Sequence, residues 1–246
     1  LRRHGLTVPR RRRHKSPPYT QPFLYCNCPN RAWSADFKGW FMTGNGERCD
    51  PLTISDNYSR YLLRCQAVRA LTIETVQPVF EAAFREYGLP EAIRTDNGSP
   101  FATTTVGGLS RLSIWWLKLG IRPERIQPGR PAQNGRHERM HRTLKGDSAQ
   151  PPKRTWRQQQ LAFDNFRQEY NYIRPHDSLQ GQTPASQYLF SSRPYPLVVP
   201  EMSYPDDMEV RWVKSQGDIS WYNRHVYLSE TLAGEPVGLK EVDNNL

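Results

Sequence analysis

Three acidic residues stand where a site for phosphoryl chemistry could form. Asp36 lies in an alternating stretch, Asp96 in a Thr-Asp-Asn-Gly turn, and Glu138 in an arginine-rich segment. Converging carboxylates repel one another at neutral pH and need a cation, and all-oxygen ligation favours Mg²⁺ or Mn²⁺. Two such ions about 4 Å apart would hold both the attacking and the leaving oxygen of a phosphodiester. Because any chain of this length has three acids, their surroundings must support the prediction.

The segment around Glu138 predicts a basic helix. Residues three, four and seven positions after Glu138 lie on its side of the helix, and they are His141, Arg142 and Lys145. A carboxylate flanked in this way fits a metal ligand beside a phosphate backbone, and an ordinary ion pair on a solvated face is the alternative. We expect DNA contacts on this helix from Asn134, Arg136, Arg139, Arg142 and Lys145.

The same segment also matches a second motif. His137-Glu138-x-x-His141 has the His-Glu-x-x-His pattern of zinc peptidases, in which two histidines bind the metal and the glutamate is the base. The surrounding arginines oppose Zn²⁺, and no third ligand is evident downstream, although His176 could be proposed. A zinc metallopeptidase is therefore a minor alternative, with the histidines as packing or DNA-facing side chains in the main interpretation.

The positive charge is concentrated in two blocks. The net charge is +10, and residues 1–15 contain seven bases and no acid, while residues 121–174 contain twelve bases and five acids. Such blocks release counterions from a nucleic-acid backbone and favour DNA as partner. A charged face that only contacts solvent would have the same composition. In the N-terminal block we expect DNA contacts from Arg10, Arg11, Arg12 and Arg13.

The hydrophobic patterning predicts an α/β fold with a mixed sheet. Residues 33–38 alternate as a half-buried strand, with Trp33, Ala35 and Phe37 on one face. Further strands and helices follow in the order expected for such a sheet. The expected strands are 33–38, 51–55, 61–68, 91–95 and 121–126, the expected helices are 72–87, 109–119, 132–145 and 156–172, and short strands recur at 210–213, 219–222 and 226–228.

Composition narrows the class of protein. With a mean hydropathy of −0.78 and no apolar run of about 18 residues, the sequence predicts no membrane-spanning helix. The first residue is Leu and the opening stretch has no apolar core, so we expect a fragment without a secretory signal. The four cysteines lack zinc-knuckle spacing, and we expect reduced, structural thiols in a cytoplasmic, nucleoid-associated protein.

The sequence resembles the catalytic core of DDE-type transposases and integrases, the insertion-sequence and retroviral integrase superfamily. Several ordered motifs between about Trp33 and Tyr188 carry this resemblance. They are Trp-Ser-Ala-Asp-Phe-Lys-Gly at 33–39, Asp-x-x-Ser-Arg at 56–60, Thr-Asp-Asn-Gly-Ser-Pro-Phe at 95–101, Gln-Asn-Gly-Arg-x-Glu-Arg-x-His-x-Thr-Leu-Lys at 133–145, and Tyr-Asn-x-x-Arg-Pro-His-x-Ser-Leu at 170–179 followed by Thr-Pro at 183–184.

The resemblance implies an RNase H-like mixed five-stranded sheet flanked by helices, followed by a small all-β, barrel-like C-terminal module. It implies Asp36, Asp96 and Glu138 as catalytic metal ligands for two Mg²⁺ or Mn²⁺ ions. It also implies 3′-end cleavage and strand transfer of a mobile element into target DNA by a homo-oligomer, a dimer or higher. The expected domains are a basic arm at 1–30, the core at 31–190, a linker at 191–207 and the β module at 208–246.

Two features depart from the family pattern. Forty-one residues separate Asp96 from Glu138, against about thirty-five in the family, and we place an insertion around Thr103–Gly108. The DNA-binding module that the family has upstream finds no match here, so a catalytically silent DNA-binding fragment and a plain nuclease of the same fold also fit the sequence. Residues 201–246 contain nine acids and four bases, which favours protein assembly over DNA binding for the C-terminal module.

Overall fold

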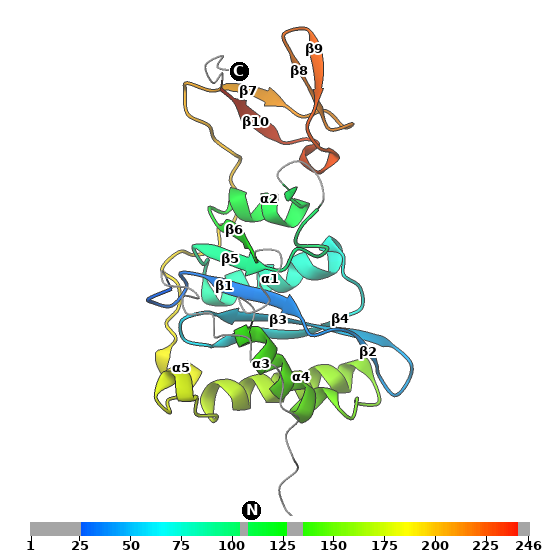
Figure 1. The fold of residues 1–246 in the computed structure, drawn as a ribbon, viewed down its shortest axis with the longest axis vertical. Coiled ribbons are helices and arrows are strands. Elements are labelled where there is room, and N and C mark those ends of the chain that lie inside the picture. Colours follow the sequence, from blue (N-terminus) through cyan, green and yellow to red (C-terminus); the bar gives the residue numbers. More distant parts are fainter. Residues whose placement is uncertain (1–25, 104–107, 127–134, 241–246) are drawn as a thin grey trace, which may run out of the picture.

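The computed structural model describes residues 26–103, 108–126 and 135–240, and Figure 1 shows their arrangement. Its strands and helices follow the predicted order. The strands are β1 Trp33–Phe37, β2 Phe41–Met42, β3 Arg48–Asp56, β4 Leu62–Val68, β5 Ala92–Thr95, β6 Arg122–Arg125, β7 Glu209–Trp212, β8 Asp218–Trp221, β9 Arg224–Tyr227 and β10 Pro236–Leu239. The α-helices are α1 Ile73–Tyr87, α2 Arg111–Lys118, α3 Gly135–Leu144, α4 Trp156–Tyr172 and α5 Pro184–Gln187, and a π-helical turn, Lys145–Ala149, follows α3.

The central sheet is mixed, as predicted. Strands β4, β3 and β1 are antiparallel neighbours, and β5 and β6 continue the sheet in parallel with β1. The two-residue β2 adds to the start of β3 beyond the end of β1. Consecutive strands joined by short turns pair antiparallel. The β4–β5 and β5–β6 connections instead contain the helices α1 and α2, and such helical crossovers allow β5 to pair in parallel with β1, and β6 with β5.

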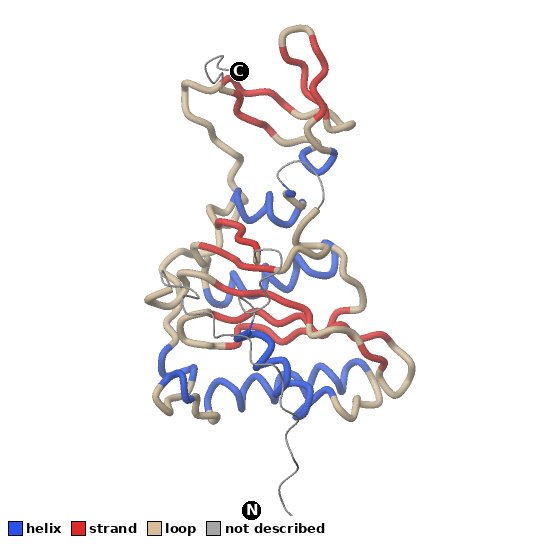
Figure 2. The backbone as a smooth tube through the Cα atoms, in the orientation of Figure 1, coloured by secondary structure: helices blue, strands red, loops and turns tan. Residues whose placement is uncertain are grey.

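Helices cover both faces of this sheet (Figure 2). On one face, α1 and α2 enclose a core that contains Trp33 and Ala35 of β1 together with Phe84 and Trp116. On the other face, α3 and α4 enclose a second core that includes Leu144. The alternation in β1 therefore places Ser34 and Asp36 toward the α3 side, as the pattern at 33–38 predicts.

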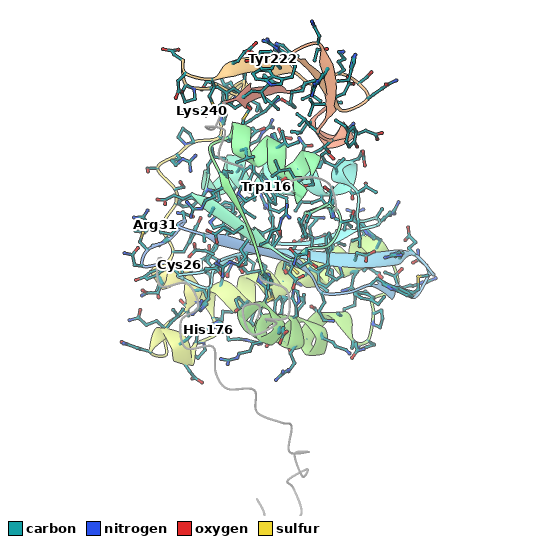
Figure 3. The ribbon with its side chains drawn as sticks, turned by 45° about the horizontal axis from the view of Figure 1, so that its top comes forward. Cys26, Arg31, Trp116, His176, Tyr222 and Lys240 are labelled. Carbon is teal, nitrogen blue, oxygen red and sulfur yellow. The ribbon has the colours of Figure 1, made fainter. Side chains whose placement is uncertain are left out.

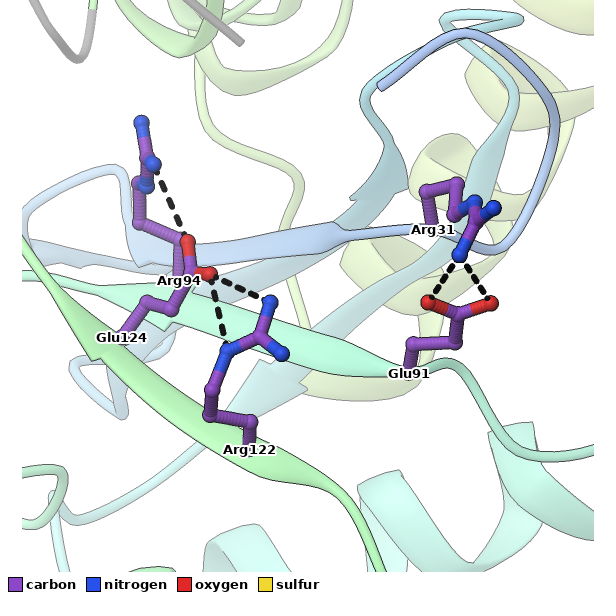
Figure 4. A network of polar contacts seen from close by, with 5 residues as sticks. All are labelled: Arg31, Glu91, Arg94, Arg122 and Glu124. Carbon is purple, nitrogen blue, oxygen red and sulfur yellow. Dashed lines mark hydrogen bonds and ion pairs between the residues drawn. The ribbon is translucent and has the colours of Figure 1, made fainter. Parts of the chain in front are cut away.

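Charged pairs join the parallel strands at the β5–β6 edge, where Figure 4 shows two groups of contacts. Arg94 and Glu124 face each other in the β5–β6 register and form an ion pair of 3.0 Å. Arg122 also binds Glu124, while Arg31, before β1, binds Glu91 at 2.6 Å. Both groups hold β5 in place beside its neighbours.

The C-terminal strands form two ladders, β7 with β10 and β8 with β9. In Figure 3, Tyr222 and Lys240 lie in this module, on the far side of α2 from the sheet. An ion pair of 2.6 Å between Lys118 of α2 and Glu235 connects the module to the core. Strand β10 lies outside the sequence prediction, because Pro236 and Gly238 disfavour strand formation unless a partner strand supplies the pairing.

Two further predictions concern cysteines and membranes. Cys49 and Cys65 are buried free thiols inside the second core, as predicted, and burial raises the pKa of Cys49 to about 12. Cys26 and Cys28 are not in disulfide bonds either. None of the helices in the described segments has the length and apolar character needed to cross a bilayer.

Candidate active site

The sheet places Asp36 and Asp96 at the same ends of neighbouring strands. Strands β1 and β5 are parallel, with Trp33 opposite Ile93 and Ser34 opposite Arg94. Asp36 follows the second pair by two residues on β1, and Asp96 follows it by two residues just beyond β5. This register places Asp36 of β1 and Asp96, which follows β5, at the same edge of the sheet.

Backbone contacts hold both aspartates. The Asp36 side chain is 15% exposed, and its residue pairs with Thr53 in the β1–β3 ladder. The Asp96 carboxylate accepts a hydrogen bond of 3.1 Å from the Gly98 N–H, which closes the Asp-Asn-Gly turn. The adjacent Asn97 amide donates to the Ile126 carbonyl at 3.1 Å, so the turn is also tied to the end of β6.

The third acid, Glu138, is presented by α3. Met140 and Leu144 on the other side of α3 are buried in the second core, which orients the helix, and Glu138 is exposed. His141, one turn after Glu138, reaches the Asp36 carboxylate, with 4.0 Å between Nδ1 and Oδ2. The buried side of α3, with His141, therefore borders the strand that carries Asp36, and Glu138 lies on the exposed side of the same helix.

A buried polar cluster beneath Asp36 is a part of the site that the sequence analysis missed. The Thr53 hydroxyl donates to the Asp36 carbonyl at 3.1 Å. The same hydroxyl oxygen lies 3.1 Å from His137 Nε2 and 2.7 Å from His141 Nε2. The histidine spacing of four residues was visible in the sequence, but nothing in the sequence pointed to Thr53 as their partner.

This cluster removes the zinc-peptidase alternative. Both histidines direct Nε2 at one hydroxyl, and Glu138 between them is exposed on a different side of the helix. Across residues 26–103, 108–126 and 135–240, no three His, Cys, Asp or Glu side chains are grouped closely enough to hold a metal, and this holds for Asp36, Asp96 and Glu138 as well. The motif reflects packing of α3 on the sheet.

Basic side chains surround this face of α3. Arg139, Arg142 and Lys145 are exposed, as expected for residues that contact phosphate. Lys38 is an addition to the predicted set, two residues after Asp36 and half-buried, and its pKa is lowered first by burial and then by the Lys145 charge. The alternation of β1 was the available signal, because Lys38 shares the Asp36 face.

Several predicted DNA contacts lie outside the described part. Residues 1–25 include the arginines of the N-terminal arm, and residues 127–134 include Asn134. Arg136 belongs to the first turn of α3, with its side chain outside the described part. The two ends of the predicted insertion are paired. The Thr103 N–H donates to the Gly108 carbonyl at 3.1 Å, and Ala102 forms an antiparallel β-bridge with Leu109. Residues 104–107 within it are not described.

The buried histidines predict a pH-dependent stability. Burial lowers the pKa of His137 to about 4 and of His141 to about 2, from 6.5. Below pH 6.5 these histidines bind protons in the unfolded chain but not in the folded chain. The histidines therefore contribute fully to the free energy of unfolding above pH 6.5, and this contribution is lost as the pH falls. We expect the free energy of unfolding to fall by about 3 kcal/mol between pH 7 and 5.

Urea unfolding across this pH range measures the effect. The His137→Asn/His141→Asn double variant removes both titrations, so its stability should change less with pH than that of the wild type. Parallel curves for the two proteins would show that the histidines do not contribute.

Comparisons with known proteins show which family this fold and these motifs belong to. Two family models, both described as integrase core domain, match residues 27–131 and 119–184 and together span the sheet and its helices. An insertion element IS476 protein of 39.2 kDa from Xanthomonas euvesicatoria, described as uncharacterized, is 30% identical over 191 residues. That match covers 76% of this chain and 53% of the relative, so the chain spans about half the relative's length.

Solved structures share the fold. A chain of the simian T-cell lymphotropic virus intasome, solved in complex with the PP2A regulatory subunit B56 gamma, has a TM-score of 0.57 and 19% identity, covering 82% of this chain and 68% of that chain. The HTLV-2 integrase catalytic core domain, solved with magnesium, has a TM-score of 0.51 and 17% identity, covering 66% of this chain and 99% of that chain. The mixed sheet with helices on both faces is thus the RNase H-like fold. With both integrase core models matched across it, the chain belongs to the integrase core family and contains the catalytic core of a DDE-type transposase or integrase.

Proposed function

We propose that this protein cuts the ends of a mobile DNA element and joins the exposed 3′ ends to target DNA, with Asp36, Asp96 and Glu138 as its catalytic residues. The observation that supports the proposal is the parallel β1–β5 register, with Asp36 on β1 and Asp96 just after β5 at the same ends of neighbouring strands. Basic residues around that face suit a phosphate backbone.

The residues fit divalent metal ions by the chemistry of their donors. Asp36, Asp96 and Glu138 offer only carboxylate oxygens, which suit Mg²⁺ or Mn²⁺, and we assign two ions to them. When bound, the ions supply Lewis-acid stabilisation of the phosphate and of its attacking and leaving oxygens. The similarity to a magnesium-bound integrase core supports this assignment without extending it to particular positions.

The remaining work falls to residues that position the DNA. In the first reaction water attacks a phosphodiester and the bond to the 3′ oxygen breaks, which leaves a 3′-hydroxyl. In the second reaction that hydroxyl attacks a target phosphodiester, and the displaced target oxygen leaves as a new 3′-hydroxyl. Lys38, Arg142 and Lys145 would hold the phosphates in line, because ammonium and guanidinium groups bind phosphate oxygens without entering the bond changes.

Assembly of at least two copies is part of the proposal, because two element ends must meet before they are joined. The C-terminal module offers exposed aromatic rings for protein contact, with Trp212 60% and Tyr222 71% exposed. Exposed aromatic side chains are frequent at the centres of protein interfaces. The domain boundaries at residues 30, 190 and 207 remain predictions.

A strand-transfer assay on labelled DNA that flanks this gene tests the function. With Mg²⁺ or Mn²⁺ we expect a shortened 3′ end and then a joined product longer than the substrate. Nicked DNA without joined product would identify a plain nuclease. DNA binding that depends on salt but not on metal, without any cleavage, would identify a catalytically silent fragment.

A further inference from the structure

A polar cavity adjoins the sheet face that carries Asp36. Ser34 precedes Asp36 by two residues on β1, so both side chains project to the α3 side of the sheet, about 7 Å apart along the strand. The Ser34 hydroxyl donates to Asn57 Oδ1 at 2.9 Å, and Asn57, which follows β3, lines the cavity. The cavity therefore begins about two strand residues from the proposed catalytic carboxylate.

The lining of this cavity is polar. The turn between β3 and β4 and residues 178–187 contribute to it, and its volume is about 430 Å³, within the range of cavities that bind small organic groups. The described residues that line it include no acid. Four amide side chains, one ring and one guanidinium supply most of its polar groups, and these are Asn57, Gln180, Gln182, Gln187, Tyr58 and Arg60.

Arg60 supplies the charge of the cavity. Its guanidinium donates to the Asn57 carbonyl at 2.5 Å, and the ion pairs among the described residues do not involve it. Burial lowers the pKa of Arg60, and the positive charge of Arg139 on α3 acts in the same direction. The basic face of α3 therefore extends to this cavity, and the guanidinium is suited to an incoming anion.

Two of the lining residues have a left-handed backbone conformation. The φ angle is 66° at Arg60 and 56° at Gln180, in a region that side chains other than glycine rarely adopt. Such conformations persist where the surrounding structure fixes them, and they cluster at sites that bind ligands. Both turns therefore favour a binding role for the cavity that they shape.

We propose that this cavity holds one unstacked nucleotide of the DNA strand that passes Asp36. The inference rests on the proposed function, which places a DNA phosphate at Asp36. Arg60 binds the phosphate of the held nucleotide, and the ring of Tyr58, a residue that is 36% exposed, stacks on its base. The amide groups of Gln180 and Gln182 bond the edge of that base, as in enzymes that hold a flipped base in a pocket.

The chemistry of the lining also predicts which base is held and where it lies. A side-chain amide pairs best with adenine, which presents an acceptor and a donor side by side, so adenine is the expected base. At 3.4 Å per nucleotide along one strand, a separation of about 7 Å places it about two nucleotides from the phosphate at Asp36.

Fluorescence of 2-aminopurine, an adenine analogue that brightens when it is unstacked, tests the proposal. Duplexes of the DNA that flanks this gene contain the analogue at one position at a time, and the full chain is added at low salt without metal ion, so that no bond is broken. We expect the fluorescence to rise at a position about two nucleotides from the phosphate that is cleaved when Mg²⁺ is added. No rise at any position would overturn the proposal.

Variants separate the cavity from general attraction of DNA. Gln180→Gly removes one amide and retains the left-handed backbone, which glycine adopts without strain, so the fold should be retained. Arg60→Gln removes the charge of the cavity. Arg157→Gln is its matched control, because Arg157 is an exposed arginine on α4 that does not line the cavity.

The expected results differ among these variants. The fluorescence rise should be lost in Arg60→Gln, reduced in Gln180→Gly and retained in Arg157→Gln, and DNA binding should be about tenfold weaker in Arg60→Gln alone. An unchanged rise in both Arg60→Gln and Gln180→Gly would overturn the proposal. A rise that depends on the cavity, in a protein that does not cleave the DNA with Mg²⁺, would refute the proposed function and leave the nucleotide site in place.

Discussion

Replacing Asp36 by asparagine is expected to lower the rates of 3′-end cleavage and strand transfer at least about 10³-fold. The amide keeps the size of the side chain but removes the charge that a divalent ion requires, and several kcal/mol of transition-state stabilisation depend on that ion. The fold should persist, because Asp36 contacts the ladder through its backbone carbonyl, which the substitution retains. The assay compares rates on end-sequence DNA at saturating Mg²⁺ and at saturating Mn²⁺.

Asp96→Asn and Glu138→Gln should lower the rates of 3′-end cleavage and strand transfer by factors of the same order. Glu47→Gln is a suitable control, because Glu47 precedes β3 in the same sheet and its ion pair is with Arg69 at the surface. Its rates should stay within about twofold of the wild type. Full activity in any one of the three site variants would remove that residue from the catalytic set.

The second large effect is a loss of stability when the core between α3 and α4 is truncated. Phe163 of α4 is fully buried in the core that also contains Met140 and Leu144 of α3, and its ring meets Phe41 edge to face at 6.5 Å between centroids. Phe163→Ala removes that contact and leaves a cavity. We expect the free energy of unfolding to fall by about 3–5 kcal/mol, measured by urea unfolding at pH 7.

Leu161→Ala is the matched control, because Leu161 lies on the same helix and its residue is 56% exposed. Its free energy of unfolding should change by about 0.5 kcal/mol or less. If the two variants unfold at the same urea concentration, α4 is not supported by this core. Loss of stability in Phe163→Ala together with weaker DNA joining would further indicate that α4 supports α3.

Local patterns predicted the elements closely. The helix expected at 156–172 is α4, because a Thr155 cap, a run of good helix formers and apolar residues at helical spacing all agree there. The first strand was readable because one of its faces is buried and its side chains alternate. The helix expected at 132–145 is described from Gly135, and it passes at its end into the π-helical turn Lys145–Ala149.

The sequence by itself determined the order of the elements and the face of β1 that carries Asp36, because these depend on residue type and spacing along the chain, and it predicts the three acids as catalytic residues. Only the tertiary structure decided that Thr53 binds both histidines, that Lys38 joins the basic face and that β10 pairs with β7. Each of these contacts joins residues distant in sequence. Their partners are set by strand register and helix packing, which no local pattern encodes.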